Sequence, residues 1–232
     1  MVSTVKVDVV APRVATGTTT LGVSGDKLLI PSGVTITNSG TSSGFASGFH
    51  QQLVYTASTS AGGYSPATDV TKIMVEILGA GGGGSHYTSH GPAVNSGAGG
   101  GYVRKTLTVV STDTMTVTIG ALGAGGGSNS PGSAGGSTTF VSASGTSFTT
   151  LTAGGGGGGS VVNYTPGVSG TATGGDLNIV GCPGRTNNVG SAEGGNSPYG
   201  YGGSASATSI TIPINNGTGY GSGGGGASDS GT

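Results

Sequence analysis

Residues 72–84, KIMVEILGAGGGG, join the two patterns that recur over most of this chain. The first part places apolar residues at positions 73, 75 and 77, with Lys, Met and Glu between them. This alternation has the two-residue period of a half-buried β-strand. Glycines follow at once, interrupted only by Ala80. The stretch therefore predicts a strand that continues directly into polyglycine.

Similar β-patterned strings follow downstream, and glycine runs as long as Gly154–Gly159 separate them. One predicted strand combines Tyr102–Val103 with Leu107–Val109, and the others are Met115–Ile119, Thr138–Val141, Phe148–Leu151, Leu177–Val180 and Ile210–Ile214. No long stretch both avoids Gly and Pro and repeats apolar residues about every 3.6 positions, as an amphipathic helix does. The predicted fold class is therefore all-β, with polyglycine segments between the strands.

The composition of the chain is not typical of an enzyme. Gly contributes 54 of the 232 residues, 6% of the residues are charged, and Trp is absent. Disordered chains combine low hydrophobicity with a high net charge, whereas this chain is 32% hydrophobic with a formal net charge of -1. We therefore expect a folded protein without catalytic activity.

The glycine content also bears on assembly. Each Gly held in regular structure costs about 0.5–1 kcal/mol more backbone entropy than Ala. For the 54 Gly residues this cost reaches tens of kcal/mol, more than the roughly 5–15 kcal/mol of net stability of a typical domain. Large side chains are too few to offset the cost within one chain, so we expect an obligate homo-oligomer.

The glycine runs allow two interpretations. A flexible linker is the ordinary meaning of a Gly-rich sequence. Here, however, the runs alternate with strand patterns, which linkers do not do. Polyglycine can instead form an extended left-handed helix with about three residues per turn, and such helices can pack at backbone distance with N–H···O and weak Cα–H···O bonds. We expect this polyglycine II packing.

Charge and cysteine content exclude several classes of partner and cofactor. The seven Lys and Arg residues are scattered, so no basic stripe indicates a nucleic acid partner. Cys182 stands alone, which leaves no disulfide framework or thiolate metal cage, and we expect a packed thiol and no cofactor. No segment resembles a signal peptide or reaches the roughly 18 apolar residues of a membrane span, so folding in a cytoplasm is expected.

Three regions follow from changes in composition. Residues 1–55 carry short predicted strands separated by Gly, Ser and Pro turns, and form an N-terminal region. Residues 56–68 combine Gly, Ser, Thr and Pro without charge, as a linker does. Residues 69–232 form the glycine-rich domain.

The third region, and more locally the first, carry a resemblance to known fibre proteins. The segments Val75–Gly84, Gly97–Val103, Val117–Gly120, Gly135–Phe140 and Ala153–Gly159 resemble the glycine-rich domain at the ends of many bacteriophage tail fibre proteins. The segment from Val5 to Phe49 resembles shaft-proximal parts of tail fibres from phages of aquatic bacteria. The glycine-rich part is also similar to the distal adhesins of T-even-type phages, in which a sandwich of polyglycine helices holds variable loops.

The resemblance implies a non-enzymatic tail fibre protein of the virion, a homotrimer that binds the host receptor. Residues 1–55 would attach to other virion tail proteins, and the glycine-rich domain would lie distally and contact a cell-surface glycan or outer-membrane receptor. Two alternatives stay open for the function, a capsid-surface fibre and an ice-binding polyglycine bundle. For the fold, an antiparallel β-domain with polyglycine on one side is an alternative to the sandwich.

Enzyme motifs find little support in the sequence. Residues 40–44, GTSSG, have nucleophile-elbow spacing without the strand and helix that the motif needs, and the glycine runs lack the helix of a dinucleotide site. Among the carboxylates only Asp69 and Glu76 are close in sequence; a spatial pair in a glycan-degrading tailspike stays open. His86 and His90 have a metal-like spacing but lie in a predicted loop, where solvated histidines are expected.

Tyrosines are the candidate receptor contacts, because a phenol ring stacks on the apolar face of a sugar while its hydroxyl forms hydrogen bonds. Five of the eight tyrosines lie in predicted loops beside glycine runs: Tyr87, Tyr164, Tyr199, Tyr201 and Tyr220. Their expected polar neighbours are His86, Asn163 and Asn196. The alternative for each tyrosine is packing as a lid over a thin core.

Overall fold

A computed structural model describes residues 52–88, 94–162, 164–187, 191–204 and 217–228. The chain divides into two compact units, residues 1–48 and 49–232. The first unit and the strands predicted within it lie outside the described residues, as does the predicted strand Ile210–Ile214. All described residues belong to the second unit.

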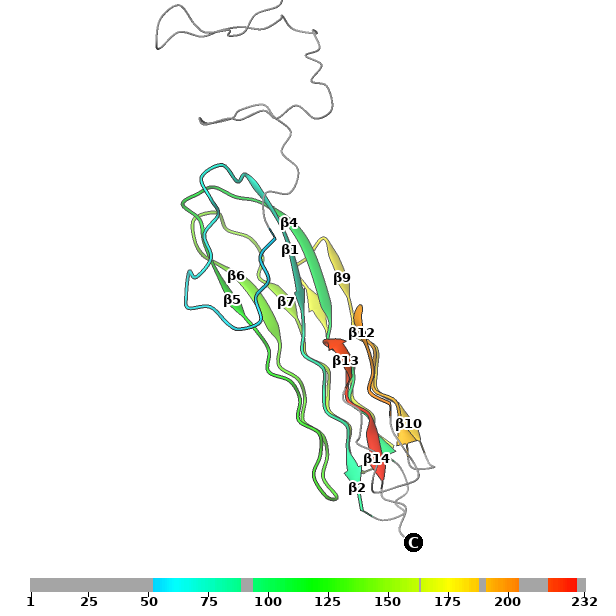
Figure 1. Ribbon diagram of the computed structural model, residues 1–232. Helices are drawn as coiled ribbons and strands as arrows, with labels where there is room; N and C mark the ends of the chain where they lie inside the picture. Colours follow the sequence, from blue (N-terminus) through cyan, green and yellow to red (C-terminus); the bar gives the residue numbers. More distant parts are fainter. Residues whose placement is uncertain (1–51, 89–93, 163, 188–190, 205–216, 229–232) are drawn as a thin grey trace, which may run out of the picture. The chain divides into compact units, whose positions relative to one another are not determined.

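Two antiparallel sheets form one end of this unit (Figure 1). The first sheet has the order β1-β4-β9, with β1 at Lys72–Leu78, β4 at Tyr102–Thr108 and β9 at Leu177–Ile179. The second has the order β5-β6-β7-β8, with β5 at Thr114–Thr118, β6 at Thr138–Ser144, β7 at Leu151–Ala153 and β8 at Ala172–Thr173. Each predicted strand within the described ranges corresponds to one of these, although β7 begins where the predicted Phe148–Leu151 ends.

The hydrophobic core lies between the two sheets. Alternate residues of β1, β4, β5, β6 and β7 point into it, which is why the sequence shows a two-residue period. The buried apolar side chains are Ile77, Val103, Leu107, Val109, Met115, Val117, Phe140, Leu151 and Ala153. Phe140 stacks on Phe148 with ring centroids 5.6 Å apart. The predicted all-β fold class is therefore confirmed for the described residues, whose sheets form no closed barrel.

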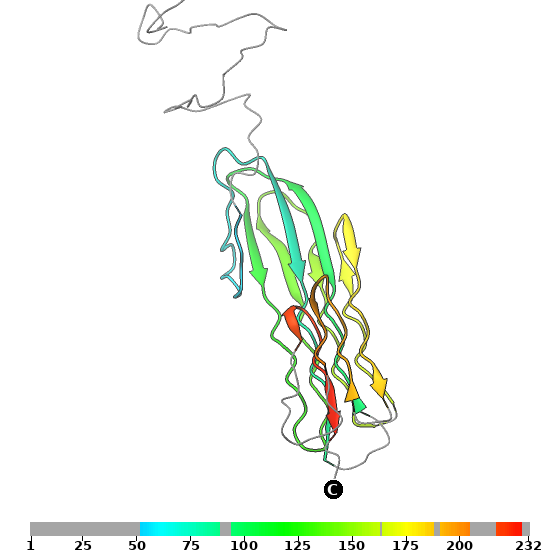
Figure 2. The same ribbon diagram turned by 45° about the vertical axis from the view of Figure 1, so that its right-hand side comes forward.

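Shorter strands lie farther along the unit. They are β2 (His86–Tyr87), β3 (Val94–Asn95), β10 (Thr186–Asn187), β11 (Ser191–Ala192), β12 (Tyr199–Tyr201), β13 (Thr218–Tyr220) and β14 (Gly226–Ser228). β3 pairs with β10, β12 pairs with β13, and β14 lies between β11 and β2. β2, β10 and β14 lie toward the end of the unit that faces away from the core (Figures 1 and 2).

Glycine-rich segments without strand assignment run side by side from the sheets toward that end (Figures 1 and 2). In Gly97–Gly101, the N–H groups of residues 97 and 100 donate to carbonyls in Gly221–Gly224, and those of 98 and 101 donate to carbonyls in Gly154–Gly157. The N–H of residue 99 donates to Cys182. The hydrogen-bonding direction thus repeats every three residues, in contrast to the two-residue period of a β-strand.

Close backbone approach explains why these segments need glycine. A Cβ added at Gly100 would overlap the carbonyl of Gly79, and one at Gly156 would overlap the carbonyl of Ala98. Gly127, in contrast, has open space where a Cβ would be. The glycines of the interior therefore act as packing residues.

Part of the predicted linker lies against the second sheet. Within the predicted linker 56–68, Thr59 N–H donates to the Val117 carbonyl at 2.9 Å, and Tyr64 and Met115 exchange backbone hydrogen bonds, so this part of the predicted linker packs along β5.

The expectation of a packed thiol at Cys182 is wrong, because the side chain is exposed. Its backbone bonds to neighbouring segments and its side chain points outward.

Helices are absent from the described residues. Accordingly, none of the residues placed by the structure belongs to a helix of the length and apolarity that a membrane crossing needs.

Candidate functional site

The candidate site begins on the outer face of the first sheet, at Glu76 and Tyr102. The register pairs Glu76 with Arg104 and Leu78 with Tyr102, so Glu76 and Tyr102 are diagonal neighbours on the same face. The Tyr102 hydroxyl donates a 2.6 Å hydrogen bond to Glu76 Oε1. Burial, and secondarily this hydrogen bond, raise the pKa of Tyr102 well above its ordinary value. Tyr102 therefore stays protonated and holds the Glu76 carboxylate in place.

Tyr199 of β12 contacts both Tyr102 and Glu76. Its ring meets the ring of Tyr102 edge-on, with centroids 5.7 Å apart and an interplanar angle of 64°. Its hydroxyl lies 3.4 Å from Glu76 Oε2, at the long end of hydrogen-bonding distance. The two contacts fix the orientation of Tyr199, although more than half of its surface is exposed.

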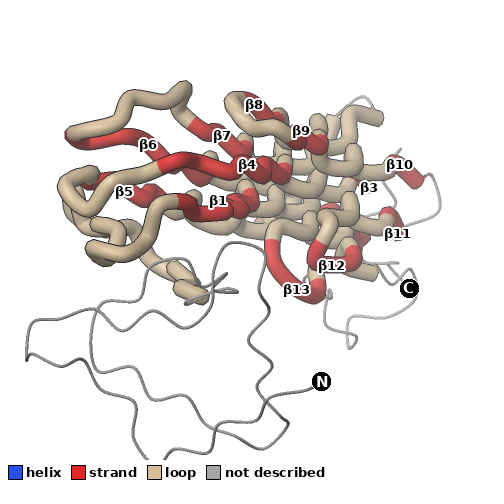
Figure 3. The backbone as a smooth tube through the Cα atoms, turned by 90° about the horizontal axis from the view of Figure 1, so that it is seen from above, coloured by secondary structure: helices blue, strands red, loops and turns tan. Residues whose placement is uncertain are grey.

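Three tyrosines share one face of the β12–β13 pair. The register places Tyr199 opposite Tyr220 and Tyr201 opposite Thr218, and residues that are opposite, or two apart on one strand, lie on the same side. Tyr201 is 77% exposed and Tyr220 is 69% exposed. We call Tyr199, Tyr201 and Tyr220 the tyrosine ribbon. Figure 3 shows β12 and β13 along one side of the unit.

A hollow of about 370 Å³ lies at this ribbon. It is lined by Asn196, Ser197, Pro198, Tyr199, Gly200, Tyr201, Thr218 and Gly219. None of these lining residues is charged. A volume near the lower end of the roughly 300–1,000 Å³ of ordinary ligand sites fits a small polar ligand or one unit of a polymer.

Short-range hydrogen bonds fix the turn that leads into β12. Asn196 Oδ1 accepts from the Gly202 N–H at 2.7 Å. The Ser197 hydroxyl donates to the Tyr220 carbonyl and accepts from the Tyr199 N–H at 3.2 Å. These hydrogen bonds thereby hold both β12 and β13 against the turn that lines the hollow.

The other predicted contact residues lie elsewhere. A loop was predicted for His86 and Tyr87, but they form strand β2 because this segment pairs in parallel with β14. Both residues are half-buried there. Tyr164 is half-exposed, and its carbonyl is 3.3 Å from the Thr186 hydroxyl of β10. Asn163 lies outside the described residues. The structure therefore brings together Asn196 and the tyrosine ribbon, and separates them from the residues near β2 and β10.

A buried polar network underlies that second group. Asn95 of β3 is fully buried, and its side chain bonds both Ser160 and Thr186. Its backbone N–H donates to the Ser85 hydroxyl at 3.0 Å. Sequence reasoning missed Asn95, Glu76 and Tyr102 as supporting residues, because their partners are far away along the chain.

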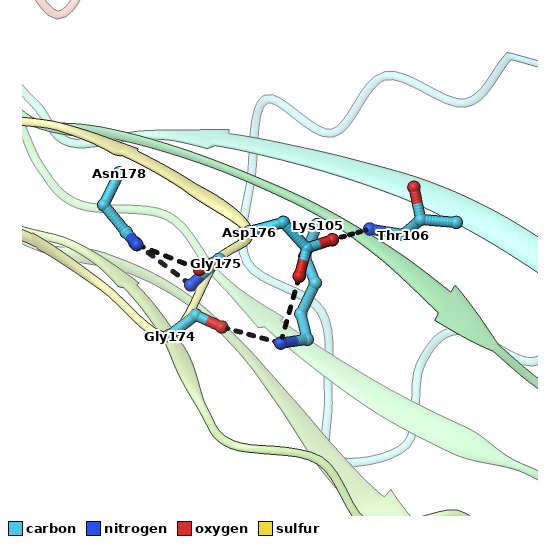
Figure 4. Close-up of polar contacts among 6 residues, drawn as sticks. All are labelled: Lys105, Thr106, Gly174, Gly175, Asp176 and Asn178. Atoms are coloured by element: carbon cyan, nitrogen blue, oxygen red, sulfur yellow. Dashed lines mark hydrogen bonds and ion pairs between the residues drawn. The ribbon is translucent and has the colours of Figure 1, made fainter.

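The carboxylate of Asp176 has structural partners on β4. Asp176 accepts from the Thr106 N–H at 3.0 Å and lies 3.6 Å from Lys105 Nζ, which also donates to the Gly174 carbonyl (Figure 4). These contacts tie the turn before β9 to β4. Over the described part of the chain, no three His, Cys, Asp or Glu side chains gather in a way that could hold a metal ion.

Asp113 and Glu193 also have partners close to them. Asp113 is buried and accepts from the N–H groups of Val110 and Thr146 at 2.9 and 2.7 Å. Glu193 lies 3.6 Å from Arg185 at the surface. Both acids thus stabilise turns and neighbouring segments.

Comparison with known proteins identifies the family. The family model of the glycine-rich domain matches residues 56–232. The chain therefore belongs to the glycine-rich domain family. No curated protein matches the sequence. The predicted resemblance to a glycine-rich domain is thus confirmed over most of the chain.

Proposed function

We propose that the chain is a non-enzymatic, structural and host-receptor-binding component of a bacteriophage tail fibre, located in the virion with its glycine-rich domain distal. The observation that carries the proposal is the tyrosine ribbon, a set of exposed aromatic side chains on a tightly hydrogen-bonded glycine body. Exposed aromatic clusters of this kind are typical of binding surfaces. The likeness of the sequence to phage fibre ends supplies the biological setting.

We further propose that the glycine segments adopt the polyglycine II conformation. The three-residue repeat of donor direction in Gly97–Gly101 supports this, because that helix has about three residues per turn. The absence of room for a Cβ at Gly100 and Gly156 supports it as well. Such a body would present surface residues on a stiff support.

The proposed assembly is a homotrimer in which residues 1–55 attach to other virion tail proteins. Large apolar side chains on the surface support burial between copies, among them Leu122 at 79%, Val168 at 74% and Val180 at 62% exposed. The entropy cost of 54 Gly residues points the same way. Light scattering of the full chain should give three times the monomer mass, and a stable folded monomer would contradict the proposal.

The binding function is tested by competition on the bacterium in which the virus carrying this gene grows. Purified full-length protein is added to the cells before the virus. Because the protein would occupy the receptor, the rate of virus adsorption should fall as the protein concentration rises. Unchanged adsorption at saturating protein, together with no measurable binding of labelled protein to the cells, would refute the receptor-binding role.

The location on the virion needs its own test. Gold-labelled antibody against the glycine-rich domain should mark the distal ends of the tail fibres in electron micrographs. Label over the capsid would instead favour the capsid-surface fibre, the alternative that the sequence left open. Inhibition of ice growth by the purified protein would favour the ice-binding bundle.

A further inference from the structure

We propose that the tyrosine ribbon and its hollow bind a neutral glycan. This inference rests on the proposed receptor-binding function and names the chemical class of the ligand. It assigns the contact to the side of the unit, at β12 and β13, and separates it from the residues near β2 and β10.

The geometry of the ribbon matches the two surfaces of a sugar. A hexose has an apolar C–H face and a rim of hydroxyl groups. Tyr201 and Tyr220 expose most of their rings, and an aromatic ring with a polar end supplies both kinds of contact. The hollow beside them, about 370 Å³, would hold one sugar unit, while the rest of a polysaccharide would continue along the surface.

The ribbon is also organised before a ligand arrives. Tyr199 is held from below by the Tyr102 ring and the Glu76 carboxylate. The Ser197 hydroxyl bonds both strands of the ribbon. Rigid aromatic anchors with few rotatable bonds lose little conformational entropy on binding. Weak individual contacts to a sugar can therefore add up to measurable affinity.

Charge favours a neutral glycan over an acidic one. All residues that line the hollow are uncharged. The Glu76 carboxylate accepts from Tyr102 beneath the ribbon, and its cross-strand neighbour is Arg104, so the acidic side chain next to the ribbon lies opposite a basic one. An acidic polysaccharide would need cationic side chains at the contact, and the lining provides none.

The test uses labelled full-length protein and host cells treated in two ways. Mild periodate oxidises the vicinal diols of surface sugars and leaves most protein intact, whereas proteinase K removes surface protein. The ribbon variant is Y201S together with Y220S, chosen because both side chains are highly exposed and their loss leaves the core intact. The matched control is Y164S, which removes a half-exposed tyrosine near β10.

We expect periodate to reduce binding of the unaltered protein at least tenfold and proteinase K to leave it unchanged. The ribbon variant should bind untreated cells at least tenfold more weakly, and Y164S should bind normally. A neutral polysaccharide extracted from the cells should compete, and an acidic one should not.

Other outcomes overturn the inference in distinct ways. Binding that is lost only after proteinase K would reject a glycan ligand but keep the receptor-binding role. Full binding by the ribbon variant, or loss of binding by Y164S alone, would place the contact elsewhere. A changed oligomeric mass of the ribbon variant would show that the ribbon is an interface between copies. Absence of binding to any untreated cells would refute the receptor-binding role itself.

Discussion

The side-chain amide of Asn95 donates a 2.7 Å hydrogen bond to the carbonyl of Ser160, 65 residues farther along the chain. Its oxygen accepts a 2.6 Å hydrogen bond from the hydroxyl of Thr186. Asn95 is fully buried, and a buried polar group is favourable only when its hydrogen bonds are made. One side chain thus joins three segments at the base of the region around β2 and β10.

Replacing Asn95 by Ala should destabilise the domain by about 1–3 kcal/mol, because the Ser160 carbonyl loses its side-chain donor and the Thr186 hydroxyl keeps only the longer of its two hydrogen bonds. The free energy of unfolding in urea measures this loss. Asn178 is a suitable control, since its side chain is exposed and bonds Gly175 only three residues away. Equal stability of N95A and N178A would show that the buried network contributes nothing.

Gly100 tests the glycine packing. An added methyl group would overlap the Gly79 carbonyl, so G100A should lower the free energy of unfolding by about 3 kcal/mol or more, as overpacking does. The control is G127A, where the space is open and the loss of chain entropy in the unfolded state should leave stability unchanged or raise it by about 0.4–1 kcal/mol. A tolerated G100A would contradict the close approach of these segments.

Asp113 predicts an acid-sensitive contribution to stability. The N–H groups of Val110 and Thr146 hold the pKa of this carboxyl below its ordinary value of 3.8. Because the pKa of Asp113 is lower in the folded state than in the unfolded state, its contribution to stability is complete when the pH lies above the unfolded-state pKa. The contribution is lost as the pH falls through the folded-state pKa. The melting temperature of D113N should therefore lie below that of the unaltered protein at pH 7. The difference between the two melting temperatures should become smaller below about pH 4. A difference that does not change with pH would contradict this role of Asp113.

Tyr102 predicts an effect at alkaline pH. Burial and the bond to Glu76 raise its pKa in the folded state, so its contribution to stability is complete below the unfolded value near 10 and decreases as the pH rises above that value. The unaltered protein should lose more stability between pH 8 and about 11 than Y102F, because Phe has no proton to lose. Denaturant unfolding at the two pH values measures the difference, and equal losses would mean that Tyr102 titrates normally.

β1, β4, β5 and β6 were predictable because their side chains alternate between a core face and an exposed face. β8, two residues long in the second sheet, was not predicted. The shorter strands outside the two sheets were not predicted either, since two or three residues of Gly, Ser, Asn or Tyr show no alternation. β12 illustrates this: Tyr199–Tyr201 reads as a loop beside glycines, and its partner β13 lies beyond residue 217.

The three-residue period of the glycine segments is visible in only part of the sequence. At Gly120–Gly126, glycines recur at positions 120, 123 and 126 and are half-buried, while most residues between them are exposed. In Gly154–Gly159 every position is Gly, because a Cβ at each of them would overlap a neighbouring segment, and the period is no longer visible in the sequence. The convergence of Tyr199 and Glu76 was equally hidden, since 123 residues separate them.

The adsorption rate of virions that carry the Y201S and Y220S changes decides whether the tyrosine ribbon contacts the host receptor. Such virions should assemble with normal fibres and adsorb to host cells at least tenfold more slowly than unaltered virions, while virions with Y164S should adsorb normally. Normal adsorption by the doubly changed virions, with the variant protein present on their fibres, would contradict that contact.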